Sequence, residues 1–352
     1  MAGLHRLLAL LALALGTVAV SVAEEKAKDA DLRRLPCPDP HDISPCVCTA
    51  DEQHNMDIDC SQVESEDQLA RVFSSTIPFP HFHALYIDGN QRLKVLRRGD
   101  LGPASFELIH ITGGVLEEVQ EEALSQSYPT LSHIYIQENN VSRFPFAELP
   151  LFTSLVFLQM HTNSLESFPG LDSDTLQQVV LSDNPFGEIP LDGFQRVKNL
   201  YSISVSANDV EILLPGTFTD LPHFTTYIST SNPADIHIPA GAPFQFGGKG
   251  QSFTSKAMSI KSIALAVITG VNAGHIYLAR NSLVVLEEDV FRPFLEGGAT
   301  LDIDGMPELG ERVVIIPNGN ISISTERGVF FPLWCLRLEG LQLSAVKDPG
   351  PR

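Results

Sequence analysis

The sequence predicts an α/β solenoid whose parallel sheet lines a concave face and whose N-terminal end is closed by a cysteine-rich cap. Two observations carry this prediction. A motif of the form apolar-x-apolar-x-x-Asn recurs along the middle of the 352-residue chain at nearly constant spacing. Four of the five cysteines lie together, between positions 37 and 60, ahead of the first copy. The 43% hydrophobic content is sufficient for one elongated core or two ordinary ones.

The repeat is recognised by its in-phase asparagines. Seven segments match the motif and end at Asn90, Asn139, Asn163, Asn184, Asn208, Asn232 and Asn281. Degenerate copies reach Gly114 and Met306. The positions 90, 114, 139, 163, 184, 208 and 232 are 21–25 residues apart, and the step from 232 to 281 is 49 residues. We therefore expect two repeats in that gap, one of them eroded.

This spacing is the signature of a leucine-rich-repeat horseshoe. Apolar residues two apart send alternate side chains of a short strand into the core, and stacked strands form a parallel sheet. Each asparagine is expected to be buried in a ladder, where its amide satisfies backbone groups of the turn. Phe194, Phe218 and Phe291 are expected to fill the space beneath the returning segment.

Residues 1–23 have the pattern of a secretory signal peptide. Arg6 precedes an apolar run, and Ser21 to Ala23 supply small residues for cleavage. A signal anchor is the alternative, but the run is about 14 residues whereas a spanning helix needs about 20. We expect a secreted, extracellular protein without a membrane span. Sequons at Asn140 and Asn320 are candidate glycosylation sites in that compartment.

The cysteine cluster predicts a stapled cap at residues 37–82, after a linker at 24–36. Four cysteines in a secreted chain indicate two disulfides, formed by Cys37, Cys46, Cys48 and Cys60. Zinc is the alternative, but paired Cys-x2-Cys knuckles are absent. Of three pairings, one containing a Cys46–Cys48 bridge is the least plausible because its loop is very tight.

The rest of the chain divides into the repeats and an atypical end. Residues 83–306 are expected to form the repeats, with an irregular insertion at 233–274, and residues 307–352 an atypical C-terminal cap and tail. Cys335 lies in that end. It is a buried thiol, the relic of a lost cap, or the site of a bridge that links two chains into an oligomer.

Charge and motifs argue against most enzymatic functions. The chain has 43 acidic and 23 basic residues, a formal charge of −20, which argues against a nucleic-acid partner. The segment Gly247 to Ser252 resembles a phosphate loop, but Gly250 follows Lys249 where Ser or Thr is needed. Because no nucleophile elbow, zinc helix or dinucleotide fingerprint occurs either, we expect no catalytic residue and no cofactor.

Strand alternation predicts which side chains face outward on the concave side. The candidate partner-binding residues are Tyr86, Asp88, His110, Tyr135, Gln137, Gln159, His161 and Tyr277. A solvated sheet face without a partner is the alternative. His110, His133 and His161 suggest a metal site, but no carboxylate or cysteine completes a cluster, so no metal is expected.

Several sequence segments resemble those of a known group of proteins. The cysteine cluster is similar to the N-terminal cap of extracellular leucine-rich-repeat proteins, which implies Cys37–Cys48 and Cys46–Cys60 disulfides. The segments 37–48, 276–281, 287–298 and 299–305 resemble secreted arthropod repeat proteins similar to the non-catalytic subunit of Oplophorus-luciferin 2-monooxygenase. The likeness covers residues 35–306. In that group a cysteine-bearing C-terminal cap follows, whereas here only Cys335 remains.

The resemblance implies support or binding, because light emission in that complex belongs to a different, small subunit. We therefore expect a secreted, non-enzymatic protein that binds or scaffolds a protein partner through its concave face. Two alternatives are an extracellular pattern-recognition or cell-adhesion protein and an accessory subunit of a secreted monooxygenase.

Overall fold

A computed structural model of the chain describes residues 37–75 and 77–206 continuously. Beyond these it describes residues 208, 210, 214, 216–218, 221–230, 244–245, 252–256, 260, 268–269, 275–283, 291, 300–302 and 320–322. The signal peptide and linker expected at residues 1–36, Asn232, Cys335 and most of the expected insertion and C-terminal cap lie outside the described residues.

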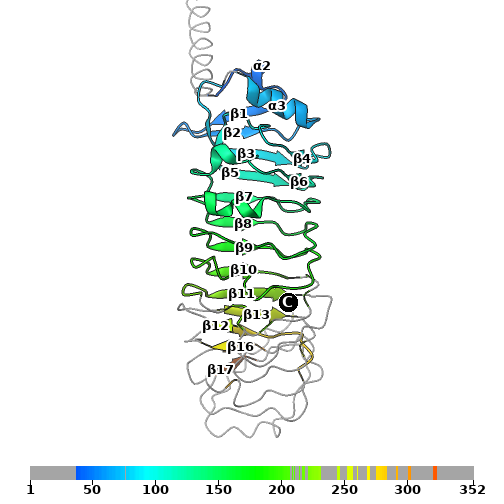
Figure 1. The fold of residues 1–352 in the computed structure, drawn as a ribbon, viewed down its shortest axis with the longest axis vertical. Coiled ribbons are helices and arrows are strands. Elements are labelled where there is room, and N and C mark those ends of the chain that lie inside the picture. Colours follow the sequence, from blue (N-terminus) through cyan, green and yellow to red (C-terminus); the bar gives the residue numbers. More distant parts are fainter. Residues whose placement is uncertain are drawn as a thin grey trace, which may run out of the picture.

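One continuous sheet runs through the molecule (Figure 1). Among the described residues thirteen strands form it, in the order β1-β2-β3-β5-β7-β8-β9-β10-β11-β13-β15-β16-β17. Their bounds are β1 Val47–Ala50, β2 Met56–Asp59, β3 His81–Asp88, β5 Ser105–Thr112, β7 His133–Tyr135, β8 Phe157–Gln159, β9 Gln178–Val180, β10 Ser202–Ser204, β11 Thr226–Thr230, β13 Ser252–Lys256, β15 His275–Tyr277, β16 Thr300–Asp302 and β17 Asn320–Ser322. Only β1 and β2 pair antiparallel; every later pair in this order is parallel.

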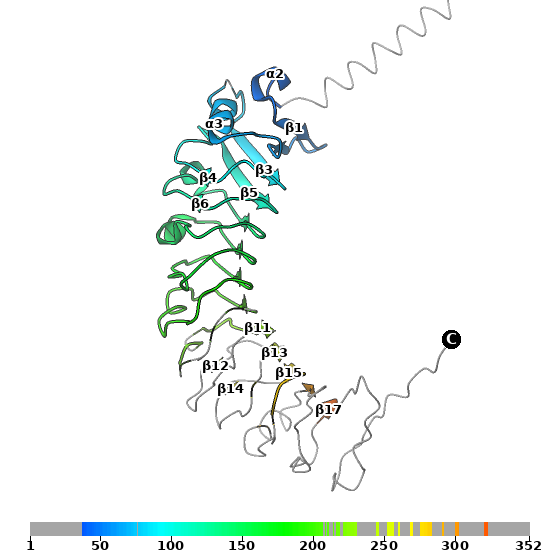
Figure 2. The ribbon, with the colours of Figure 1, turned by 90° about the vertical axis from the view of Figure 1, so that its right-hand side faces the viewer.

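The predicted solenoid is confirmed. Figure 2 shows the strands along the concave edge and the returning segments on the convex side. The returning segments contain two short strand pairs, β4 (Val95–Leu96) with β6 (Glu118–Val119) and β12 (Phe244–Gln245) with β14 (Ile268–Thr269). They also contain the 3-10 helices η1 (Ser125–Ser127) and η2 (Phe146–Leu151).

A strand occupies the long gap between motif copies. β13 lies between β11 and β15, with Phe253 in register with Tyr227 and Ile276. The chain therefore crosses the sheet once within this gap, as expected for an eroded repeat. At the far end β17 continues the sheet beyond residue 306, with Ile321 in register with Leu301.

The core lies between the sheet and the returning segments. The first apolar position of each motif is buried, for example Leu85, Ile134 and Ile203, each with no exposed side-chain area. Phenylalanines fill the convex side: the Phe194 and Phe218 rings stack with centroids 4.9 Å apart, and Phe291 is also buried. Burial of such apolar surface is the main favourable contribution to folding.

The asparagines are buried and connect neighbouring repeats through backbone groups. Their exposed fractions are Asn90 6%, Asn139 7%, Asn163 8%, Asn184 2%, Asn208 0% and Asn281 1%. Asn163 Nδ2 donates to the carbonyl of Ile136 (2.6 Å), and its Oδ1 accepts from the N–H of Val141 (2.9 Å). Each amide thus satisfies backbone groups that the turn leaves without a partner.

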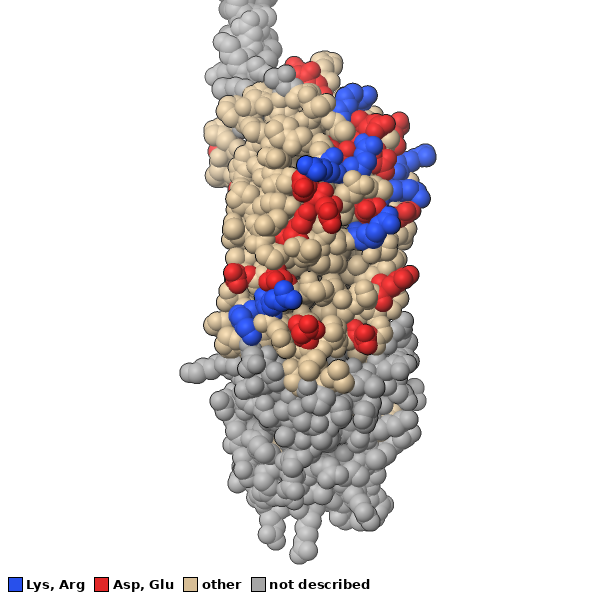
Figure 3. Space-filling model, viewed as in Figure 1, with Lys and Arg blue, Asp and Glu red and all other residues tan. Residues whose placement is uncertain are grey.

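Charged side chains gather on the side of the molecule where β4 and β6 lie (Figure 3). There Lys94 pairs with Glu117 and Arg98 with Glu122, each at 2.7 Å. Arg143 pairs with Glu118 of the preceding repeat. Lys94, Arg98 and Arg143 are therefore each paired with a carboxylate of a neighbouring repeat.

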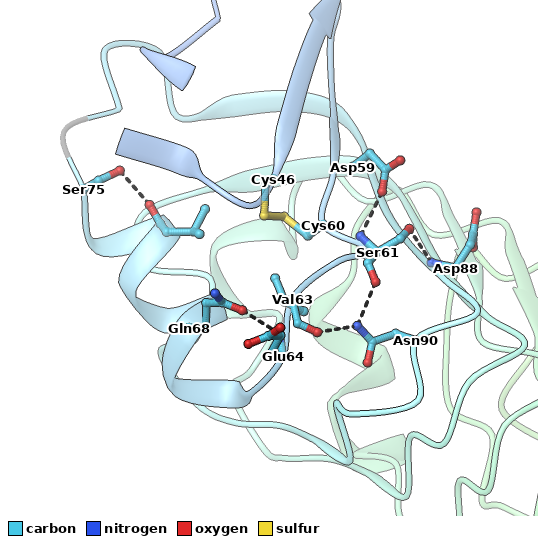
Figure 4. The surroundings of a disulfide bond; sticks show 11 residues. Cys46, Asp59, Cys60, Ser61, Val63, Glu64, Gln68, Ser75, Asp88 and Asn90 are labelled. Carbon is cyan, nitrogen blue, oxygen red and sulfur yellow. Dashed lines mark hydrogen bonds between the residues drawn. A yellow bond between two sulfur atoms is a disulfide. The ribbon is translucent and has the colours of Figure 1, made fainter. Parts of the chain in front are cut away.

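The N-terminal cap joins the first repeat. It contains α2 (Pro40–Ile43), the β1–β2 hairpin and α3 (Glu66–Ser74). The Cys37–Cys48 and Cys46–Cys60 disulfides implied by the resemblance are confirmed. Figure 4 shows the second of them beside Asn90, whose Nδ2 donates to the carbonyls of Ser61 (2.9 Å) and Val63 (2.7 Å). The asparagine ladder thus extends into the cap.

Candidate functional site

A continuous row of aromatic rings lies on the N-terminal half of the concave face. We call Tyr86, His110, Tyr135, His133 and Phe157 the aromatic track. Its rings come from the four neighbouring strands β3, β5, β7 and β8, whose register aligns Tyr86 with His110 and Tyr135. Ring centroids are 5.6 Å apart for Tyr86 and His110, 5.5 Å for His110 and Tyr135, and 5.2 Å for Tyr135 and Phe157.

Carboxylates hold histidines at the N-terminal end of this track. His110 Nδ1 lies 2.7 Å from Asp88 Oδ1, which also accepts from the Thr112 hydroxyl at 2.9 Å. His83 Nδ1 lies 2.8 Å from Asp57 Oδ1. These contacts fix the imidazoles beside the track with both carboxylates partly exposed.

The environment of Tyr86 is both half-buried and negatively charged. Burial raises the pKa of its phenol, and the charges of Asp57 and Asp88 raise it further. The hydroxyl therefore stays protonated and available as a hydrogen-bond donor at neutral pH. An aromatic ring with a polar end is well suited to a protein interface.

The remaining predicted binding residues do not all lie next to the aromatic track. Gln159 aligns with Tyr135 and extends the row, whereas His161 Nδ1 contacts the Thr162 hydroxyl at 3.1 Å. Gln137 is half-buried, and its Oε1 is buried without a hydrogen-bond partner among the described residues. Tyr277 stacks on His275 in β15, and β9, β10, β11 and β13 separate it from the track. The structure thus brings the N-terminal candidates together and leaves Tyr277 apart.

Sequence reasoning missed Phe157 as a binding candidate and considered His133 only for metal binding. Both precede the first buried apolar residue of their motifs. Because side chains alternate along a strand, this preceding position faces outward as well. The same rule would have added Asp57, which precedes the buried Ile58. The sequence therefore also predicts a third set of outward-facing residues, at the position before the first buried apolar residue of each motif.

Metal ligands do not gather on the part of the chain that the structure describes. Groups of three or more histidine, cysteine, aspartate or glutamate side chains placed to hold a metal ion are absent there. His133 instead contacts the Ser132 hydroxyl at 2.8 Å and stacks on Tyr135. His110 contacts the Asp88 carboxylate, and His161 contacts the Thr162 hydroxyl.

The first sequon lies on the surface of a turn. Asn140 is exposed directly after the buried Asn139, and its N–H donates to the carbonyl of Leu116. Asn320 lies in β17. Among the described helices, all are too short or too polar to cross a membrane.

Comparison with known proteins finds an extended match among curated sequences. No family model matches the sequence. The chain is 34% identical over 277 residues to the Oplophorus-luciferin 2-monooxygenase non-catalytic subunit of Oplophorus gracilirostris, covering 76% of each chain. It is 24% identical over 186 residues to the transforming growth factor beta activator LRRC33 of Danio rerio, covering 49% of this chain but 27% of that protein.

Solved structures support the fold alone. A chain from the octameric complex of Latrophilin 3, Unc5D and FLRT2 (LRR) has a TM-score of 0.53 and 20% identity, covering 69% of this chain and 72% of that one. A chain from the Toll–Spatzle complex of Drosophila has a TM-score of 0.50 and 13% identity, covering 73% and 41%. Together with the extended match, these findings show that the chain belongs to the leucine-rich-repeat family of the Oplophorus-luciferin 2-monooxygenase non-catalytic subunit.

Proposed function

We propose that this chain is a secreted, non-enzymatic protein that binds a protein partner through the N-terminal half of its concave face. The aromatic track is the observation that carries the proposal. Interfaces concentrate their binding energy in a few half-buried aromatic side chains surrounded by polar groups. Tyr86, His110 and Tyr135 form such a group on a rigid parallel sheet, and Gln159 and Asp88 supply polar groups around it.

The continuity of the aromatic track favours a partner-binding face over a solvated face without a partner. Further along the same sheet, the outward positions are Gln178 and Val180 in β9 and Ser202 and Ser204 in β10. A solvated face needs no aromatic side chains, and their exposure to water costs free energy. Aromatic rings from several neighbouring strands adjoin one another in the N-terminal half, whereas Tyr277 and His275 stack within the single strand β15.

A second function is supported by the family. The relative from Oplophorus gracilirostris is the non-catalytic subunit of a monooxygenase. We propose by analogy that the partner of this chain is a small secreted catalytic protein, which this chain stabilises. Co-purification with a luciferase-like protein supports this role, whereas light emission by the isolated chain contradicts a non-enzymatic function. Binding of the labelled chain to microbial glycans or host cells would instead favour recognition or adhesion.

The first prediction concerns the track itself. We expect Tyr86→Ala combined with Tyr135→Ala to reduce recovery of crosslinked partner from the native secretion about tenfold or more, because two hot-spot rings are lost. Recovery is measured by quantitative mass spectrometry against the wild-type chain.

The matched control is Gln178→Ala combined with Ser202→Ala, which removes side chains from the same face on β9 and β10, the next two strands beyond the track. Near-wild-type recovery is expected for this variant. Circular dichroism establishes that both variants are folded. Equal recovery of partner by all three folded chains would place the binding site elsewhere.

A further inference from the structure

Basic residues are absent from the strands around the aromatic track, whereas acidic residues occur there. The strands β2, β3, β5, β7, β8, β9 and β10 contain no lysine or arginine, whereas β2, β3 and β5 contain Asp57, Asp59, Asp88 and Glu107. Lys94, Arg98 and Arg143 pair with carboxylates on the side where β4 and β6 lie, and Arg196 pairs with Asp172 in a later returning segment (Figure 3). The aromatic track thus lies on the part of the sheet, from β2 to β10, whose strands contain acidic but no basic residues.

Three aspartates surround the first ring of the track. Asp59 in β2 is in register with Tyr86 in β3, and Asp57 precedes Asp59 by two positions in β2. Asp88 follows Tyr86 by two positions in β3. The described contacts of Asp57 and Asp88 with His83 and His110 use only Oδ1 of each carboxylate. The side chain of Asp88 is 46% exposed and that of Asp57 38%. Further hydrogen bonds at these carboxylates are therefore compatible with the contacts described.

We propose that the aromatic track and these three aspartates bind an arginine- or lysine-rich segment of the protein partner. The inference rests on the proposed function, because it specifies the chemistry of the same surface. Cations are attracted to the faces of aromatic rings, and a guanidinium stacks on a tyrosine while it pairs with a carboxylate. The net charge of −20 adds long-range attraction for such a segment.

The dimensions favour a chain segment over a single small cation. The strands from β2 to β8 are five neighbours, and four intervals of about 4.8 Å give about 19 Å of continuous surface. A single ammonium covers one ring, whereas an extended peptide of about six residues covers this length. A neutral glycan would use the rings but not the aspartates, and salt sensitivity separates it from a basic segment.

The test uses the full secreted chain and a labelled peptide of alternating arginine and serine. We expect fluorescence anisotropy to show binding that weakens as salt is raised to about 0.15 M. Asp57→Asn combined with Asp88→Asn should weaken it about fivefold, because both substitutions remove charge but keep an oxygen acceptor for the histidines. The matched control, Glu117→Gln with Glu122→Gln, removes two charges from the β4–β6 edge and should weaken it less than about twofold.

The possible outcomes distinguish failure of the basic-segment proposal from failure of the proposed partner binding. Equal weakening by both pairs of substitutions shows that only net charge attracts the peptide and overturns the inference. If partner recovery depends on Tyr86 and Tyr135 but not on salt or the aspartates, partner binding stands and the basic segment is wrong. Salt-insensitive binding of neutral glycans that requires the same tyrosines also overturns it. If the tyrosines have no effect on partner recovery either, both proposals fail.

Discussion

Gly114 occupies the position of the ladder asparagine in seven other repeats, and its surroundings leave no room for a side chain. A Cβ added there would lie 2.6 Å from the carbonyl oxygen of Asn90 and 3.0 Å from Oδ1 of Asn139. Both oxygens already accept hydrogen bonds, from the N–H groups of Val115 and Leu116. We expect Gly114→Ala to lower the free energy of unfolding by about 1–3 kcal/mol, measured by urea denaturation, because overpacking forces these acceptors apart.

The matched control is Gly170→Ala, since a Cβ at Gly170 meets nothing within 4 Å. That variant should have nearly wild-type stability or be slightly more stable, because alanine restricts the unfolded chain. Gly114→Asn restores the repeat consensus but should be destabilised as well. A stabilised Gly114→Asn would show that the degenerate turn can adopt the geometry of the others.

Strand alternation predicted the outward side chains one by one but not which of them would meet. Tyr86, His110 and Tyr135 share a column because their motifs are in phase, and parallel register places equivalent positions side by side. Tyr277 has the same motif position but lies on a distant strand. Contact between rings depends also on side-chain rotamers, and the motif does not specify these.

Polar contacts cap the N-terminus of helix α3 and connect the helix to the next repeat. Ser65 Oγ accepts from the N–H of Gln68 at 3.2 Å, and Gln68 Oε1 accepts from the N–H of Glu64 at 2.6 Å. This arrangement is close to a capping box. Glu66 in the first turn accepts from the N–H groups of Lys94 and Val95 in the next repeat. The helix is thus anchored to β4.

Glu66 makes the stability of this contact depend on pH. Burial raises the pKa of its carboxyl, but hydrogen bonds from backbone N–H groups, including those of Lys94 and Val95, outweigh this effect and lower the pKa below its ordinary value. A carboxyl whose pKa is lower in the folded state than in the unfolded state stabilises the fold at a pH above the unfolded-state pKa. This stabilisation is lost as the pH falls through the folded-state pKa. We expect Glu66→Gln to lower the free energy of unfolding by about 1 kcal/mol at neutral pH.

The difference between this variant and the wild type should shrink as the pH falls below about 4.5. Denaturant midpoints measured across this range give the comparison. Glu121→Gln, at an exposed position, is the control and should follow the wild type throughout. A Glu66→Gln deficit that stays constant into acid would assign the effect to shape and not to charge.

The eroded repeat shows what the motif could not specify. The 49-residue gap predicted a missing copy, yet the strand within it was not recognised because Ser255 occupies the second apolar position and Met258 the asparagine position. Pairing with β11 and β15 on both sides holds β13 in the sheet. Tertiary pairing here outweighs the local sequence, as it commonly does in strands. The β1–β2 hairpin was likewise not predicted, since its apolar pattern is too short to distinguish from a loop.

The whole molecule is a stack in which each repeat packs mainly on its neighbours. Such solenoids approximate a sum of repeat stabilities and nearest-neighbour interfaces, so their ends need a cover. The cap provides it at the N-terminal end, where Cys46 and Cys60 are buried in the same core as Phe73 and Phe82. The aromatic track begins one strand beyond the cap. A change in the cap should therefore reach the proposed binding face before it reaches distant repeats.

Removal of the inner disulfide tests this coupling. The Cys46–Cys60 bridge spans 14 residues, and replacing both cysteines with serine should cost the cap about 3 kcal/mol. Because coupling passes between neighbours, hydrogen exchange should speed up most in β2 and β3 and least in β9 and β10. Cys37→Ser with Cys48→Ser, whose sulfurs lie in less buried residues, should perturb the same strands less. Equal acceleration in every strand would show instead that the described part of the solenoid unfolds as one cooperative unit, and loss of the track would then follow loss of the fold.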